Sequence, residues 1–180
     1  MARMNLVEHE QATGRTREAL DKMKKKTGQI KNIVKLMANS HVGLEAYMKL
    51  NEVLASGSLD TPTRERVALA VGEQTGCQYC VSAHTLIGKH AGLSADEMVE
   101  NRKGSSSDPK MAAIVRFARE AVATNGHVQD TVLEDLRANG VTDAEIVEVI
   151  VAVILNLYTN LLNHVGDPEI DFPKVSLLSK

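Results

Sequence analysis

The chain has 180 residues, of which 43% are hydrophobic, and a formal net charge of -2. This length and hydrophobic content exclude a disordered chain and suit one domain with a proper core. The small net charge gives no general attraction for nucleic acid or an anionic membrane surface. The start of the chain lacks the apolar core of a signal peptide, and two cysteines do not make a secreted disulfide scaffold, so we expect a cytoplasmic protein.

Helical signals begin after a polar start. Residues 1–14 show no periodicity, and we expect them to be loose. A short basic helix is predicted over 16–26, followed by a helical stripe of apolar residues from Ile30 to Met37. Ser40 is a suitable N-cap for the next helix, which Gly57 ends.

The second half of the chain is also helical by pattern. Ser94 with Glu97 predicts a capping box for a short helix, and Thr142 with Glu145 predicts another. No strand pattern of any length is present, so we expect an all-α single-domain helical bundle over 1–180. Its further helices are expected between Asp108-Pro109 and Asn125-Gly126, over 129–138, and over about 143–164.

The stretch from Ile146 to Leu157 is the most apolar part of the chain, with Glu148 and Asn156 as its only strongly polar residues. We interpret it as too short and too interrupted to span a bilayer, which needs about 20 apolar residues. A helix that is apolar nearly all round is buried, so it is either central or shared with another subunit. After it, from about 166 to 180, we expect an extended C-terminal arm.

Two helices in the middle of the chain are predicted to form an antiparallel hairpin. Thr61-Pro62 starts the first, Thr75-Gly76 stops it, and the second runs over 78–90. With the tip near Gly76, His84 lies level with Ala68. Glu65 is then three residues further along, roughly 4–5 Å at helical rise, which a glutamate side chain spans.

This hairpin carries both cysteines of the chain, Cys77 and Cys80. Their spacing lets the two sulfurs form a disulfide or share a metal. Cys77 starts the second helix, where backbone N–H groups lower the pKa of a thiol, and His84 shares a helix face with Cys80. Two thiols, an imidazole and a carboxylate that orients it are the parts of an activated nucleophile.

Two other interpretations of the cysteine pair stay open. The cysteines are either inert and buried, or they bind zinc together with His84, with His90 or water as the fourth ligand. Structural zinc sites usually bring a second ligand cluster from elsewhere in the sequence, so the redox interpretation is favoured.

The spacing Glu65, eleven residues, Cys77, two residues, Cys80, three residues, His84 resembles the active site of the alkylhydroperoxidase D-like proteins. These proteins belong to the carboxymuconolactone decarboxylase superfamily, and the resemblance runs from about Gly43 to Phe172. One position departs from the pattern, because Tyr79 stands where well-known members carry histidine. Tyrosine does not titrate near neutral pH, which puts a relay role for this position in question.

The resemblance implies a thiol-dependent peroxidase or disulfide reductase acting on hydroperoxides. Cys80 is then the attacking thiol, Cys77 the resolving thiol, His84 the base and Glu65 the residue that orients it. The backbone N–H groups at the helix N-terminus instead favour Cys77 as the thiol of lower pKa.

The resemblance also implies a lipoyl-type dithiol as electron donor, a homo-oligomer that is commonly a trimer or hexamer, and no prosthetic group. Lactone decarboxylation of the carboxymuconolactone type is an alternative, although that chemistry does not need the cysteine pair. A non-enzymatic redox-sensing or zinc-stabilised module is the other.

Overall fold

The structure is a computed structural model that describes residues 2–178, and over that range every regular element is helical. A short 3-10 helix, η1 (His9–Gln11), precedes the α-helices. The α-helices are α1 (Gly14–Thr27), α2 (Asn32–Met37), α3 (His41–Ala55), α4 (Thr61–Thr75), α5 (Gln78–His90), α6 (Ala95–Lys103), α7 (Pro109–Ala123), α8 (Asp130–Ala138) and α9 (Asp143–Gly166). The predicted all-α fold class is confirmed.

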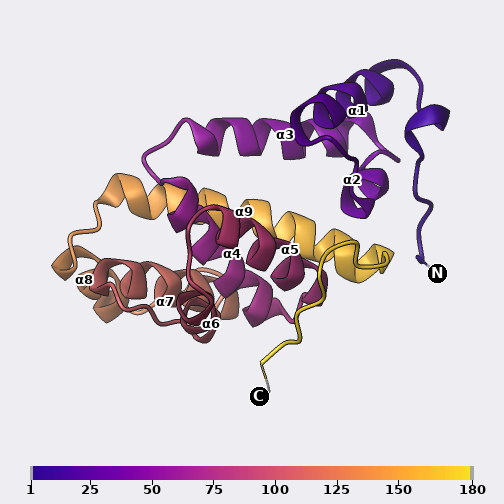
Figure 1. Ribbon diagram of the computed structural model, residues 1–180. Helices are drawn as coiled ribbons and strands as arrows, with labels where there is room; N and C mark the ends of the chain where they lie inside the picture. The colour runs from indigo at the N-terminus through magenta and orange to yellow at the C-terminus, as the bar shows by residue number, and fades with distance from the viewer. Residues whose placement is uncertain (1, 179–180) are drawn as a thin grey trace.

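Helices α4 and α9 organise the molecule (Figure 1). Helix α4 packs against α5, α6, α7 and α9, and α9 also contacts α2, α3 and α7. One hydrophobic cluster fills the space among α4, α7 and α9, with Val71, Phe117 and Val149 buried in it. A second cluster joins α1, α2 and the start of α3 to Cys77 and Cys80, so the cysteines lie against a helical layer contributed by the N-terminal part of the chain.

The predicted N-caps are present, but only one of the two predicted capping boxes is complete. Ser40 accepts a hydrogen bond from a backbone N–H of α3, and Thr142 and Glu145 form the full capping box of α9. Ser94 caps α6 by accepting from the backbone N–H of Glu97. The Glu97 side chain does not return to the cap, because it is engaged elsewhere.

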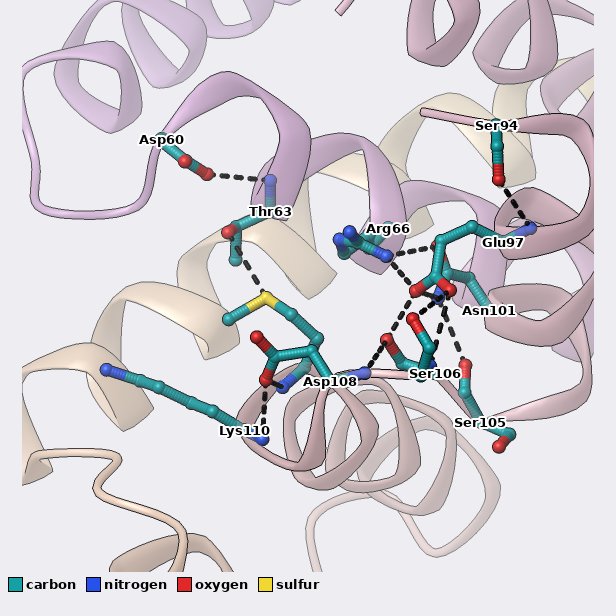
Figure 2. A network of polar contacts seen from close by, with 12 residues as sticks. Asp60, Thr63, Arg66, Ser94, Glu97, Asn101, Ser105, Ser106, Asp108 and Lys110 are labelled. Carbon is teal, nitrogen blue, oxygen red and sulfur yellow. Dashed lines mark hydrogen bonds and ion pairs between the residues drawn. The ribbon is translucent and has the colours of Figure 1, made fainter. Parts of the chain in front are cut away.

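Figure 2 shows where that carboxylate goes. Glu97 pairs with Arg66 on α4 and accepts hydrogen bonds from the hydroxyls of Ser106 and Ser107. Asn101, which is fully buried, donates to the same carboxylate and also to the carbonyl of Ser105. The network therefore fastens the loop between α6 and α7 to the helix that carries Glu65.

We expect Glu97→Gln to destabilise the protein in a pH-dependent way. Burial raises the pKa of Glu97, but hydrogen bonds from Ser106, Ser107 and Asn101 outweigh it and lower the pKa from the ordinary 4.5 to about 2. Because the folded-state pKa is depressed, the charged form stabilises the fold above pH 4.5, and this contribution is lost as the pH falls towards 2. The variant should lose about 1–3 kcal/mol of unfolding free energy at pH 7.

Urea unfolding followed by circular dichroism at pH 7 and at pH 3 tests this expectation. The control is Glu100→Gln, since Glu100 lies on the same helix and pairs with Lys103 at the surface. A loss from Glu97→Gln that is equally large at both pH values would show that shape, rather than charge, is what the network requires.

The N-terminal segment is more ordered than we expected, so the prediction of a loose start is corrected. The backbone N–H of Arg3 donates to the carbonyl of Gly166 at 2.7 Å, and that of Val7 donates to Lys35 on α2 at 3.2 Å. Lys35 also pairs with Glu8. These contacts bind the segment to α2 and to the end of α9; Met1 lies outside the described residues.

The chain that follows α9 is extended and turns back past α5 (Figure 1). Over 167–178 it makes hydrogen bonds to residues of α2, α4 and α5. These include Asn32 and Tyr79 to the Asp171 carboxylate, Val175 to the Ser82 hydroxyl, and Leu178 to the Glu73 carboxylate. The last two residues of the predicted arm, 179–180, lie outside the described residues.

Helix α9 has 24 residues and is longer than predicted. By length and composition alone it is apolar enough to cross a membrane, which corrects our expectation that it is too short. Its contacts with α2, α3, α4 and α7 are those of a core helix in a helical bundle. A core helix passes the same length and composition test, so the test is weak evidence for a membrane span.

Candidate active site

Cys77 and Cys80 are joined by a disulfide at the start of α5. Gly76 ends α4 with a left-handed backbone, φ 72°, which lets the chain reverse into α5 at once. Cys77 is then the N-cap, and its sulfur accepts a hydrogen bond from the backbone N–H of Cys80 at 3.3 Å. Gly72 on α4 permits close packing against α5, because an added Cβ would lie 3.3 Å from Cγ2 of Val81. The two cysteines are only 1% and 3% exposed.

The predicted hairpin register brings Glu65 to His84. The Nδ1 atom of His84 lies 2.7 Å from Oε2 of Glu65, and both side chains are mostly buried between α4 and α5. An ionised carboxylate only accepts hydrogen bonds, so Nδ1 carries the proton and Nε2 is the ring atom that remains able to take one. No hydrogen bond joins His84 to either sulfur in the disulfide form described by the structure.

A cavity of about 450 Å³ lies beside the disulfide. Cys80 and His84 both line it, together with mainly apolar side chains that include Ile87 and Phe172, whereas Cys77 does not line it. A second cavity of about 410 Å³ shares His84 and also reaches Glu65. The imidazole therefore lies where the two cavities meet, and Cys80 is the sulfur that a small molecule in the first cavity would reach.

Tyr79, the departure from the family pattern, is held in place by three residues from two other parts of the chain. Its hydroxyl donates to Oδ1 of Asp171 at 2.6 Å and accepts from the backbone N–H of Ile33 at 3.2 Å. Its ring packs edge-on against Phe172 with centroids 5.5 Å apart. Burial, reinforced by the hydrogen bond to Asp171, raises the pKa of Tyr79. These contacts join α2 and the C-terminal arm to the turn of α5 between the cysteines.

Sequence reasoning missed one residue that contacts the sulfurs. Asn163 on α9 is 6% exposed, and its Nδ2 atom donates to Sγ of Cys80 at 3.2 Å and lies 3.9 Å from Sγ of Cys77. It lies in the helix that we predicted from its apolar residues. The signal available in the sequence was the series Asn156, Asn160 and Asn163, which recurs at helical spacing within a helix that is otherwise mainly apolar.

The structure describes the oxidised state of the cysteine pair. Both sulfurs are used in the disulfide, and among residues 2–178 no three His, Cys, Asp or Glu side chains converge in a way that could hold a metal ion.

Comparison with known proteins relates the part of the chain that carries this site to a family. Residues 43–124, which include Glu65, Cys77, Cys80 and His84, match the carboxymuconolactone decarboxylase family. A Ralstonia eutropha protein, described as an alkylhydroperoxidase AhpD core and an uncharacterized peroxidase-related protein, shares the fold with a TM-score of 0.81. The two chains are 21% identical over 96% of this chain and 92% of that one. The family match therefore covers less than half of the chain and includes the hairpin of α4 and α5, while the fold of the chain is of the alkylhydroperoxidase D-like type.

One protein of similar fold is described as having a different activity. The debrominase Bmp8, solved in complex with 2,3,4-tribromopyrrole, is 16% identical to this chain with a TM-score of 0.75, over 95% of this chain and 94% of that one. A relative in Haemophilus influenzae, an uncharacterized protein, is 50% identical over 42 residues. That match covers 23% of this chain and only 37% of the relative.

Proposed function

We propose that this chain is a member of the carboxymuconolactone decarboxylase superfamily and a thiol-dependent peroxidase that reduces hydroperoxides and is regenerated by a dithiol. One observation carries the proposal. The disulfide places Cys80 on the wall of a largely apolar cavity, and the same cavity is lined by the imidazole that Glu65 holds at 2.7 Å. A redox-active sulfur, a base and a site for a small substrate therefore adjoin one another.

In the proposed reaction the reduced enzyme begins with the Cys80 thiol giving its proton to Nε2 of His84. The thiolate attacks the terminal oxygen of the hydroperoxide, an S–O bond forms and the O–O bond breaks. The departing alkoxide takes the proton from the imidazolium and leaves as an alcohol. Cys77 then attacks the sulfenic sulfur of Cys80, water leaves and the disulfide forms; an external dithiol reduces that disulfide by exchange.

Different features favour each of the two cysteines as the attacking thiol. Cys77 is the N-cap of α5 and receives a backbone hydrogen bond, which favours a thiolate there. Cys80 lines the substrate cavity and lies one helical turn from His84. Access to the peroxide decides which sulfur reacts first, so we assign the attack to Cys80 and resolution to Cys77.

We also propose a cytoplasmic homo-oligomer, a trimer or hexamer as the family implies, that receives electrons from a lipoyl-type dithiol partner. The support for association is a stripe of exposed apolar side chains along α9, spaced at intervals of three, four or seven residues, which we call the α9 stripe. It consists of Val147, Ile150, Ile154, Leu161 and Val165. An apolar stripe of this length on a soluble bundle is typical of an interface between subunits.

Ile154→Glu is expected to weaken association, because Ile154 is 52% exposed in the middle of the α9 stripe and a charge there must be desolvated in an interface. Static light scattering at micromolar concentration should show a multimer of the 19.6 kDa chain for the wild type and a shift towards 19.6 kDa for the variant. Gln129→Glu, an exposed position at the start of α8, adds the same charge away from the stripe and serves as the control. A wild-type protein that is already a monomer would contradict the proposal.

The function is tested by following hydroperoxide consumption in the presence of a lipoyl dithiol, with hydrogen peroxide and an apolar organic hydroperoxide as substrates. Catalytic turnover that disappears in Cys80→Ser supports the proposal. A reversible disulfide without turnover would favour the redox-sensing module, and turnover of a carboxymuconolactone or a bromopyrrole instead would favour the chemistry of the relatives. Metal analysis of the purified protein accompanies the assay, since stoichiometric zinc would contradict a redox role.

A further inference from the structure

Asn163 has an arrangement that packing does not explain. Three buried asparagines lie on α9, and two of them donate to groups other than the sulfurs. Asn156 donates to the carbonyl of Ala152 in its own helix, and Asn160 donates to the hydroxyl of Thr75. Asn163 instead donates to Cys80. The carbonyl oxygens of Asn160 and Asn163 are both buried with no hydrogen-bond partner, but of these two residues only Asn163 contacts a sulfur and lines the cavity beside the disulfide.

An unpartnered carbonyl oxygen in a buried position is unfavourable, and leucine has a similar volume without this polar atom. Stability therefore does not favour asparagine here. Asn163 lines the same cavity as Cys80 and His84, and its carboxamide lies against the sulfur of Cys80. This acceptor is closed to solvent in the disulfide form, so the O–H of a substrate reaches it only after reduction has separated the two sulfurs.

We propose that Asn163 is a catalytic residue with two roles in the attack by Cys80, an inference that rests on the proposed peroxidase function. Its N–H group stabilises the Cys80 thiolate, and its carbonyl oxygen accepts the O–H of the bound hydroperoxide. Both polar atoms belong to one planar carboxamide. The hydroperoxide hydroxyl bound by the carbonyl oxygen therefore lies next to the Cys80 sulfur bound by the N–H group. The oxygen to be attacked is thereby placed at the nucleophile.

The bonds and protons of the step balance without a further reactant. The thiolate of Cys80 attacks the hydroxyl oxygen of the hydroperoxide and the O–O bond breaks. The alkoxide receives its proton from the His84 imidazolium. The sulfenic acid keeps the hydroxyl hydrogen, and its O–H continues to donate to Asn163 until Cys77 displaces it as water.

This assignment also resolves the competition between the two sulfurs. The sulfur of Cys77 receives a hydrogen bond from the backbone of α5, and the sulfur of Cys80 receives one from Asn163 at a similar distance, 3.3 Å against 3.2 Å. Each sulfur therefore has a hydrogen-bond donor, and the position of Cys77 at the helix terminus gives it no advantage in this respect. Cys80 additionally faces the cavity, so it is the sulfur with both a donor and a substrate.

The first experiment measures the Cys80 thiol itself and needs no turnover. In a Cys77→Ser background, the thiolate absorbance at 240 nm is followed as a function of pH for Asn163→Leu and Asn163→Ala. Loss of a hydrogen bond to a charged group should raise the Cys80 pKa by about one to two pH units. Asn156→Leu, which removes a buried amide from the same helix without touching a sulfur, should leave it unchanged. Equal pKa values in all variants would overturn the thiolate role.

The second experiment measures the reaction with an organic hydroperoxide above the thiol pKa, where every variant is a thiolate. Because the acceptor for the peroxide O–H is also missing, both Asn163 variants should still react about tenfold more slowly than the Asn156→Leu control. Circular dichroism confirms folding, and Asn163→Leu keeps the side-chain volume if Asn163→Ala does not fold. If the control reacts and the Asn163 variants match it in pKa and rate, this inference alone fails. If the Cys80 thiolate of the Asn156→Leu control fails to react with any hydroperoxide, both this inference and the proposed peroxidase function fail.

Discussion

Cys80→Ser is expected to abolish hydroperoxide consumption, by about 10³-fold or more, because it removes the nucleophile on which every later step depends. Cys77→Ser should behave differently. Without a resolving thiol, one equivalent of peroxide should convert Cys80 to a sulfenic acid and catalysis should then stop. Rapid mixing with one equivalent of peroxide, followed by mass spectrometry after trapping with dimedone, distinguishes the two variants.

The two substitutions control for each other, since both replace a sulfur with oxygen in the same buried turn. If Cys80→Ser formed the trapped sulfenic acid and Cys77→Ser did not, the assignment would be reversed and Cys77 would be the attacking thiol. If neither variant formed it while the wild type consumed peroxide, the cysteines would not be the reacting groups.

His84→Ala is expected to lower the rate of the peroxide reaction by about 10²–10⁴-fold, the usual contribution of general acid–base catalysis. The Cys80 pKa should rise in this variant. Glu65→Gln should cause a smaller loss, because glutamine still accepts from Nδ1 of His84 but does not stabilise the imidazolium. The Glu65→Gln/His84→Ala double variant should be little worse than His84→Ala alone, because Glu65 acts through His84.

Single-turnover kinetics with an organic hydroperoxide, measured for the two single variants and the double variant, test this expectation. His90→Ala is the matched control, since it removes another imidazole from the same cavity. Additive losses from Glu65→Gln and His84→Ala would mean that the carboxylate acts independently of the imidazole. An effect of His90→Ala as large as that of His84→Ala would mean that the cavity, rather than the ion pair, controls the rate.

The contact between Glu65 and His84 could be predicted because it depends only on signals that are local in the sequence. Helix limits are set by neighbouring residues such as Pro62 and Gly76, and helical rise then fixes which residues of a tight hairpin face each other. The same local signals placed Cys77 at the start of α5. The fold class followed from periodicity in the same way.

The remaining features depend on which distant elements meet, and periodicity does not contain that information. Asn163 reaches the sulfurs only because α9 crosses the start of α5, and Asp171 reaches Tyr79 only because the chain reverses after α9. Glu97 satisfied the sequence rule for a capping box, yet Arg66 and Ser106 offered its carboxylate more partners than the cap did. The N-terminal segment was predicted to be loose because its partners, including Lys35 and Gly166, lie on other elements.

The site therefore assembles from contacts of very different range. Glu65 and His84 are 19 positions apart, whereas Asn163 and Cys80 are separated by 83 and Asp171 and Tyr79 by 92. Closing a long loop costs more conformational entropy than closing a short one, and contacts of high sequence separation are slow to form. During folding, the ion pair of the hairpin should be in place before the sulfurs acquire their amide donor. A fragment limited to residues 60–91 would carry the complete family motif and still lack the environment in which its cysteines react.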